Sequence, residues 1–213
     1  IMVLSDSAHS FGAKYQGKRS GALTDVTVFS FHAVKNLTTA EGGAVALNLP
    51  PPFDNEAVYR DLCIKTLHGQ NKDALAKSAK GNWKYDIVEA GYKCNMTDIS
   101  AAIGMVELKR YDSDTLLKRK EIVKAYDLAF AADHRFELPL HSTGSRESSF
   151  HLYPLRIKHI GETQRDEIIK RIFDRDVSVN VHFIPVPGTS FYRSLGYDLS
   201  EYPIALDNFQ REI

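Results

Sequence analysis

This sequence of 213 residues has no long apolar run and only two cysteines. It also has no excess of charge of either sign. Lysine plus arginine and aspartate plus glutamate each number 27, so no global positive field indicates nucleic acid or an anionic membrane as a partner. No apolar run approaches the roughly 20 residues that span a bilayer. The composition therefore indicates neither a membrane-spanning protein nor a nucleic-acid-binding one.

Cysteine is nearly absent, with only Cys63 and Cys94 in the chain. Their spacing matches neither a disulfide framework nor a metal site, so we expect two small, partly buried side chains. So few cysteines favour a reducing compartment. The first residues also lack a charged n-region followed by a long apolar stretch, and we therefore expect a cytoplasmic protein.

The apolar pattern predicts an α/β protein in two parts. The first part contains strands expected at 1–6, 26–31 and 44–47, helices at about 53–67 and 98–108, and a polar loop at 69–85. A charged helix at about 114–131 leads to the second part, with a strand at 151–157, a helix at 163–173 and a strand at 177–183. We therefore expect two domains, residues 1–113 and a small α+β domain at 114–213.

The most informative segment is residues 29–43, FSFHAVKNLTTAEGG. A strand-like run delivers the hydroxyl of Ser30, the imidazole of His32 and the amine of Lys35 into one turn, and two glycines allow close backbone packing behind it. An amine in a partly desolvated turn can have a lowered pKa and be nucleophilic near neutral pH. A lone lysine is more often a solvated surface residue, so this interpretation depends on its neighbours.

Asp6 is the second candidate, because it directly follows the apolar residues 1–4. These residues are typical of a buried parallel strand, and open α/β sheets bind ligands at the carboxyl ends of such strands. Alone, Asp6 would be interpreted as a turn or helix-cap residue. A carboxylate and a lysine at one site suit pyridoxal phosphate, since the lysine can bind the aldehyde and the acid can keep the pyridine nitrogen protonated.

Three motifs together resemble the DegT/DnrJ/EryC1/StrS family of pyridoxal-phosphate sugar aminotransferases. They are residues 6–9 (DSAH) with 29–43, residues 91–104 (GYKCNMTDISAAIG), and the weaker 181–186 (VHFIPV). The resemblance implies an α/β, aspartate aminotransferase-like fold (fold type I). In that fold the chain would form the C-terminal part of a mostly parallel-sheet large domain, followed by a small α+β domain. The wording around Lys35 is nearest the branch resembling UDP-4-amino-4-deoxy-L-arabinose aminotransferases.

Family members are longer than this chain, and position 1 falls at the strand that carries the cofactor aspartate. The segments that would supply a phosphate-binding turn and a ring-stacking aromatic residue have no counterpart here, nor do the final strand and helix. We therefore expect a fragment of a longer polypeptide. An isolated part of such a sheet would expose strand edges and apolar faces, so we expect it to need other segments for activity.

The resemblance also implies roles for individual residues. Lys35 would be the catalytic, cofactor-linked lysine, and Asp6 would hold the ring nitrogen. Ser30 would bind the cofactor phosphate, and His9 would lie beside a cofactor oxygen, although a turn histidine is an equal alternative for it. Lys93 and Asn95 would reach the phosphate from a second subunit of a homodimer with shared active sites, and His182 could face the nucleotide-linked sugar.

The implied reaction transfers an amino group from an amino acid, by family analogy glutamate, to a keto group of a nucleotide-linked sugar. Family dehydrases have histidine in place of the lysine, so Lys35 favours amino transfer. Three alternatives stay open at this point: a non-catalytic fragment that needs a complementary chain, an aminotransferase acting on a keto-cyclitol, and a phosphate-ligand binder in which Ser30, His32 and Lys35 hold an anion without covalent chemistry.

Overall fold

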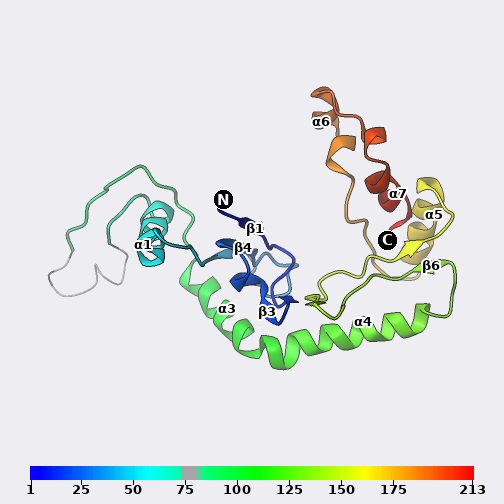
Figure 1. Ribbon diagram of the computed structural model, residues 1–213, viewed down its shortest axis with the longest axis horizontal. Helices are drawn as coiled ribbons and strands as arrows, with labels where there is room; N and C mark the ends of the chain where they lie inside the picture. Colours follow the sequence, from blue (N-terminus) through cyan, green and yellow to red (C-terminus); the bar gives the residue numbers. More distant parts are fainter. Residues whose placement is uncertain (73–80, 82) are drawn as a thin grey trace. The chain divides into compact units, whose positions relative to one another are not determined.

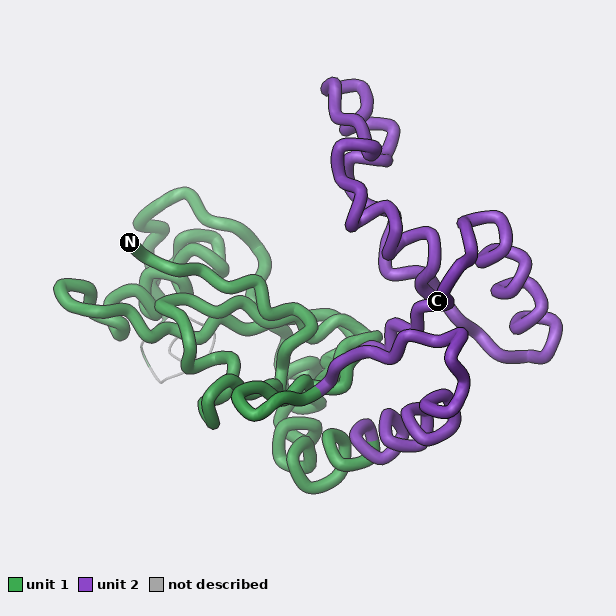
Figure 2. Tube along the Cα trace, turned by 45° about the vertical axis from the view of Figure 1, so that its right-hand side comes forward, with its two compact units in different colours: residues 1–118, 142–151 green, residues 119–141, 152–213 purple. Residues whose placement is uncertain are grey.

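The computed structural model describes residues 1–72, 81 and 83–213, and part of the loop expected at 69–85 lies outside these residues. The chain divides into two compact units (Figures 1 and 2). Unit 1 comprises residues 1–118 and 142–151, and unit 2 comprises 119–141 and 152–213. The domain division expected at residue 113 stays a prediction.

The main sheet of unit 1 has the strand order β1-β4-β5, formed by β1 (Leu4–Asp6), β4 (Val26–Ser30) and β5 (Gly43–Leu47). Strand β1 runs parallel to β4, with Asp6 opposite Val28. Strand β5 runs antiparallel to β4, with Gly43 opposite Ser30. The strands expected at 26–31 and 44–47 are confirmed to within one residue, and the strand expected at 1–6 forms only over its last three residues. A mostly parallel sheet stays a prediction, because this sheet contains one parallel and one antiparallel pair.

The expectation that residues 1–4 are buried is wrong. Leu4 is 67% exposed, Val3 is 49% exposed, and only the end of the apolar run pairs as a strand. The physical reason is that β1 is the edge strand of this sheet, with β4 as its one neighbour among the described strands. An edge strand without a covering layer leaves its apolar side chains in solvent.

The core of unit 1 lies under the turn that follows β4. It is formed by Phe29, Phe31, Leu37 and Tyr111, and Phe11 packs against this group. The ring of Phe11 meets the ring of Tyr111 edge to face, with 4.9 Å between centroids. Such pairs add stability beyond the area that they bury. The core therefore ties the segment before β4 and the turn after it to a helical residue from later in the chain.

Gly43, at the start of β5, allows the close packing that the sequence predicts behind the Lys35 turn. A Cβ atom at this position would lie 2.6 Å from the backbone oxygen of Phe29 on β4. Backbone cannot yield as the end of a side chain can, so only glycine fits here.

A small second sheet has the order β3-β2-β7, with β2 (Lys14–Tyr15), β3 (Lys18–Arg19) and β7 (Arg146–Glu147). Gln16 and Gly17 connect β2 to β3 with φ values of 47° and 77°, as a two-residue hairpin with two left-handed residues requires. Strands of two residues carry too little pattern to be predicted. Strand β7 nevertheless explains why residues 142–151 belong to unit 1.

The helices of unit 1 begin at recognisable caps. Helix α1 (Asn55–Thr66) begins after Asp54, whose side chain accepts from the Glu56 N–H. Helix α3 (Asp98–Arg110) begins after Thr97, as predicted, because the Thr97 hydroxyl accepts from the Ser100 N–H at 3.2 Å. A π-helical turn (Tyr111–Thr115) then leads into α4 (Leu116–Phe130), which confirms the charged helix (Figure 1).

Unit 2 contains a short antiparallel pair and several helices. They are β6 (Phe136–Glu137), β8 (Arg156–Ile157), α5 (Glu162–Phe173), α6 (Ser190–Ser194) and α7 (Pro203–Arg211). Arg165 on α5 is almost fully buried, and its guanidinium donates to the backbone oxygen of Phe209 and stacks on that ring at 4.8 Å. This contact fastens α5 to α7.

Two expectations for unit 2 need correction. The strand expected at 151–157 is limited to β8, and the strand expected at 177–183 does not form. A strand exists only where its backbone finds a ladder partner, and apolar composition cannot supply one. In residues 177–183 the Val181 N–H instead donates to the side-chain oxygen of Asn180.

The two cysteines also differ from expectation. Cys63 on α1 and Cys94 are exposed free thiols and not partly buried side chains. In the described residues, no helix combines the length and apolar composition needed to cross a membrane.

Candidate functional site

Two predicted site residues lie at one edge of the main sheet. Asp6 is the last residue of β1 and Ser30 is the last residue of β4. Because β1 and β4 are adjacent and parallel, both residues lie at the carboxyl ends of their strands. This is the edge at which open α/β sheets bind ligands.

Local hydrogen bonds orient both side chains. The Asp6 carboxylate is exposed, and its Oδ1 accepts from the Ala8 N–H at 3.1 Å, which makes the tight turn after β1. The Ser30 hydroxyl accepts from the His32 N–H at 3.4 Å. Its own proton can then be donated to an anion. The two positions therefore offer one negative acceptor and one hydroxyl donor.

Lys35 lies in the turn that continues from Ser30. Its N–H donates to the His32 carbonyl at 2.9 Å, and its side chain is half-buried. The two residues after it, Asn36 and Leu37, are 6% and 2% exposed. A lysine beside two buried residues is carried on a rigid turn and not on a loose loop. The sequence thus predicts correctly that one strand and its turn carry both Ser30 and Lys35.

The neighbours of Lys35 brace the turn. Nε2 of His32 lies 3.5 Å from Oε1 of Glu41, and both side chains are largely exposed. The Thr39 N–H donates to the Phe31 carbonyl at 2.9 Å, and the Phe31 N–H donates to the Gly42 carbonyl at 2.8 Å. These bonds close the loop between β4 and β5 onto the core. These backbone bonds hold the turn, and the exposed His32–Glu41 pair adds little to them.

His9 lies in the turn after β1, close to Asp6 in the sequence. Its carbonyl oxygen accepts from the Ser149 hydroxyl at 2.6 Å. Its ring lies 4.3 Å from the ring of His151, centroid to centroid, at an interplanar angle of 50°. Sequence reasoning missed Ser149 and His151, because they are about 140 residues further along the chain and no local pattern relates them to His9.

Lys93 and Asn95 lie on an extended segment beside the end of α1. The Lys93 ammonium donates to Oδ1 of Asn95, and the backbone N–H of Asn95 donates to the Thr66 carbonyl at 3.1 Å. Both side chains are exposed. Among the residues that the structure describes, no hydrogen bond or ion pair joins these two side chains to Lys35. They are available to another molecule.

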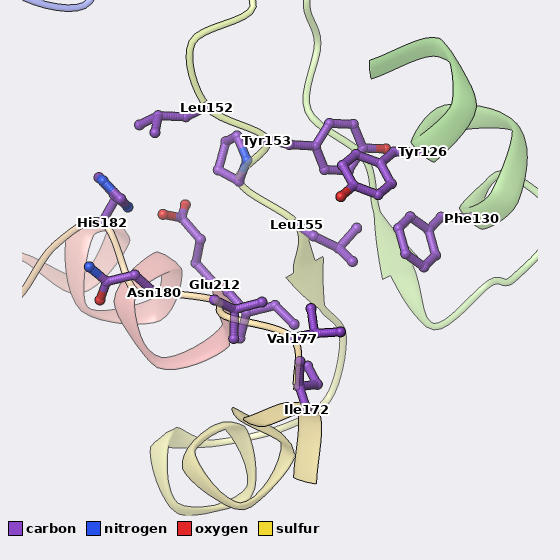
Figure 3. A pocket seen from close by; sticks show the side chains of 13 residues that line it. Tyr126, Phe130, Leu152, Tyr153, Leu155, Ile172, Val177, Asn180, His182 and Glu212 are labelled. Carbon is purple, nitrogen blue, oxygen red and sulfur yellow. The ribbon is translucent and has the colours of Figure 1, made fainter. Parts of the chain in front are cut away.

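His182 lines a cavity of about 390 Å³ in unit 2. Figure 3 shows His182, Asn180 and Glu212 on one side of this cavity and Tyr126 and Phe130 on the other. The lining side chains include no lysine or arginine, and most of them are apolar. A phosphate group would find no fixed positive charge among these lining residues, so the cavity does not by itself define a nucleotide site.

Burial changes the ionisation of two groups in this cavity. The pKa of the Glu212 carboxyl is raised because burial disfavours its charged form, and the nearby Arg156 offsets part of this effect. The pKa of Tyr153 is raised by burial and by its hydrogen bond to Oδ1 of Asp127, at 2.8 Å. Both shifts favour the neutral form of the side chain.

The fold defines the class of protein. The structure superimposes on Spr1654 from Streptococcus pneumoniae, a proposed sugar aminotransferase solved in its PMP-form, with a TM-score of 0.90 and 47% identity. The match covers 100% of this chain and 53% of that one. This chain therefore has the fold of about half of that longer chain.

The DegT/DnrJ/EryC1/StrS aminotransferase family matches over residues 1–213, and the chain belongs to this family. It is 35% identical to the spore coat polysaccharide biosynthesis protein SpsC of Bacillus subtilis, over 100% of this chain and 54% of that protein. It is 33% identical to a UDP-4-amino-4,6-dideoxy-N-acetyl-beta-L-altrosamine transaminase of Campylobacter jejuni, over 92% of this chain and 48% of that protein. The chain thus spans about half the length of these relatives.

Proposed function

We propose that this chain carries the cofactor-binding lysine of a pyridoxal-phosphate-dependent aminotransferase. The enzyme would transfer an amino group from an amino acid, by family analogy glutamate, to a keto group of a nucleotide-linked sugar. The observation that carries this proposal is the juxtaposition of Asp6 and Ser30 at the ends of two adjacent parallel strands, with Lys35 on the anchored turn that follows.

The residues at this edge fit pyridoxal phosphate. The cofactor has a pyridine nitrogen, a phosphate and an aldehyde, and the edge offers a carboxylate, a hydroxyl and an amine. When bound, pyridoxal phosphate supplies an electron-withdrawing ring that makes the α-proton of an amino acid removable. The match of three chemical groups to three side chains favours this cofactor over a simple anion, which would use only Ser30 and the charge of Lys35.

Each residue then has a defined task. The Asp6 carboxylate would accept a hydrogen bond from the protonated ring nitrogen, and its negative charge would keep that nitrogen protonated. The Ser30 hydroxyl donates to a phosphate oxygen. The Lys35 amine would hold the cofactor covalently and, once an amino acid has taken its place, would act as the base that takes the α-proton and as the acid that delivers it to the cofactor. His9 would lie beside the cofactor, and His182 would face the sugar nucleotide.

We further propose that the enzyme is a homodimer with shared active sites, in which Lys93 and Asn95 reach the cofactor phosphate of the other subunit. Their side chains are exposed, and so is the ring of Tyr92, the residue before Lys93. A lysine suits a phosphate dianion as a point charge. The exposed thiols of Cys63 and Cys94 fit a reducing compartment such as the cytoplasm.

The substrate class rests on relatives and the particular sugar stays open. The Campylobacter jejuni relative is named for a UDP-linked amino sugar, and SpsC for polysaccharide synthesis. The resemblance to UDP-4-amino-4-deoxy-L-arabinose aminotransferases stays a prediction. Keto-cyclitols are the alternative acceptors that an experiment must include.

The test is a half-reaction screen of an enzyme of the relatives' full length that contains this chain, loaded with pyridoxal phosphate. Incubation with glutamate should remove the absorbance of the aldehyde form, and a nucleotide-linked keto-sugar should restore it. Lys35→Ala should abolish both changes, because no other amine on this turn can hold the cofactor or move the proton. Lys14→Ala is the matched control, since Lys14 lies on the small β3-β2-β7 sheet, and it should leave both changes intact.

Two results would contradict the proposal. Turnover that survives in Lys35→Ala would exclude the covalent role of this lysine. Regeneration of the aldehyde by keto-cyclitols and by no nucleotide-linked sugar would replace the substrate class while keeping the cofactor chemistry.

A further inference from the structure

The contacts of Asn36, the residue that follows Lys35, fix the orientation of its amide. Nδ2 of Asn36 lies 2.7 Å from the backbone oxygen of Ser149 and 3.3 Å from the hydroxyl oxygen of Tyr111. A backbone carbonyl can only accept a hydrogen bond, so the atom facing it must be the NH₂ group of the amide. Oδ1 of Asn36 must then face the other way.

That oxygen determines the tautomer of His151. Nδ1 of His151 lies 2.8 Å from Oδ1 of Asn36. Because an amide oxygen has no proton to give, His151 must be the donor, and its Nδ1 must carry the proton. In the neutral ring the lone pair is then on Nε2. Asn36 is 6% exposed, so water cannot easily substitute for this partner.

The same short segment also holds His9. The Ser149 hydroxyl donates to the His9 carbonyl at 2.6 Å, while the His151 ring contacts the His9 ring at 4.3 Å between centroids. Residues 149–151 therefore contact two turns at once: the turn after β1, which carries His9, and the turn after β4, which carries Lys35. Phe150 between them is 5% exposed and adopts φ = 53°, a conformation that a bulky residue keeps only when its surroundings enforce it.

We propose that His151 is a positioning residue, locked by Asn36 with its proton on Nδ1, that holds the His9 imidazole in place for the cofactor. With Ser149 it forms a clamp, residues 149–151, that keeps the His9 turn and the Lys35 turn in a fixed relation. This inference rests on the proposed function, since His9 meets a cofactor only if pyridoxal phosphate binds at this edge. The tautomer of His151 does not depend on the cofactor.

The first experiment measures the tautomers without cofactor. Long-range ¹H–¹⁵N spectra of the imidazoles, recorded near pH 8 where an ordinary imidazole is neutral, should show His151 protonated on Nδ1. The signal is assigned by its loss in His151→Asn. A proton on Nε2, or a fast-exchanging mixture, would overturn the lock.

The second experiment measures pyridoxal phosphate affinity. His151→Asn keeps an amide donor for Asn36 but removes the ring that contacts His9, so the dissociation constant should rise about tenfold and the His9 signals should broaden. His159→Asn is the matched control, because His159 is exposed and has φ = 60°, which asparagine tolerates. It should leave the affinity unchanged.

A second variant guards against simple misfolding. Ser149→Ala removes the hydroxyl that donates to His9 and should weaken cofactor binding in the same direction while the His151 tautomer stays the same. Unchanged affinity and unchanged His9 signals in both variants would overturn the positioning role. If the unsubstituted protein fails to bind pyridoxal phosphate, the proposed function fails and the cofactor part of this inference fails with it, while the tautomer spectrum still decides the lock.

Discussion

At the scale of single residues, the proposed role of Asp6 depends on its negative charge more than on the hydrogen bond that its side chain makes within the turn. Its Oδ1 already accepts from the Ala8 N–H, so an amide could keep the turn after β1 but would lack the negative charge that keeps a pyridine nitrogen protonated. The residue therefore separates binding from turnover more cleanly than Lys35 does.

We predict that Asp6→Asn binds pyridoxal phosphate within about tenfold of the unsubstituted protein but turns over about a hundred- to a thousandfold more slowly, the loss expected when one preorganised charge is removed. Steady-state kinetics and a cofactor titration measure the two effects. The control is Asp25→Asn. The Asp25 carboxylate also accepts a hydrogen bond from a backbone N–H, that of Val3 at 2.7 Å, but Asp25 lies just before β4, at the opposite end of that strand from Ser30. Equal loss of turnover in both variants would contradict a special role for Asp6.

Much of the candidate site at this scale could be predicted from the sequence. Asp6, Ser30 and Lys35 each follow a strand-like run closely, so local pattern places them at one sheet edge. Asn36, Ser149 and His151 could not be predicted, because Asn36 and Ser149 are 113 positions apart and meet only in the folded chain. A buried asparagine leaves no local signal beyond its type.

At the scale of elements, one hydroxyl connects the π-helical turn after α3 to the site. Tyr111 is 2% exposed, its hydroxyl donates to the Phe11 carbonyl at 2.6 Å, and the same oxygen accepts from Nδ2 of Asn36 at 3.3 Å. The helix thereby holds both the segment before β2 and the turn after β4.

We predict that Tyr111→Phe lowers the free energy of unfolding of unit 1 by about 1–3 kcal/mol, because it leaves buried polar groups without this partner. Urea unfolding measures the loss, and the dependence of the unfolding free energy on urea concentration should be the same in both proteins. Tyr126→Phe is the control: its ring is 47% exposed, and we expect a change within about 0.5 kcal/mol. A loss no larger than the control's would show that water or neighbouring groups replace the hydroxyl.

Helices and strands were predicted correctly where the local sequence marks the residue at which they begin or end. The Thr97 cap and the periodic residues after it defined α3, and the run before Ser30 defined β4. Residues 177–183 have equally apolar character but form no strand, because strand formation depends on a partner that their own composition does not specify.

At the scale of the whole molecule, unit 2 contains a half-buried acid, Glu212, whose ionisation links the stability of the unit to pH. The pKa of Glu212 is raised by burial, so the folded form holds its proton to higher pH than the unfolded chain does. Stability from this group is therefore fully present below the ordinary carboxyl pKa of about 4.3 and is lost as pH rises through the raised value.

We predict that Glu212→Gln raises the melting temperature at pH 7 and leaves it unchanged at pH 4 and below, since the amide never has to bury a charge. Melting curves of both proteins at the two pH values test this. Glu201→Gln, at an exposed position, should show no such difference between the two pH values. A stabilisation of the same size at both pH values would indicate better packing and not relief of a buried charge.

The surface of the chain carries many large apolar side chains. Ile99 on α3 is 77% exposed and Val106 on the same helix is 61% exposed. Large apolar side chains that are exposed on one helix are typical of interfaces. The exposed apolar side chains of α3 accord with the proposed homodimer.

The central claim is the covalent attachment of the cofactor to one lysine. Incubation with pyridoxal phosphate, reduction with borohydride and mass spectrometry of the peptides test it directly, and no substrate is needed. We predict one modified peptide, containing Lys35, and no modification in Lys35→Ala. Stable labelling at Lys93 or scattered over surface lysines, with Lys35 unmodified, would contradict the account.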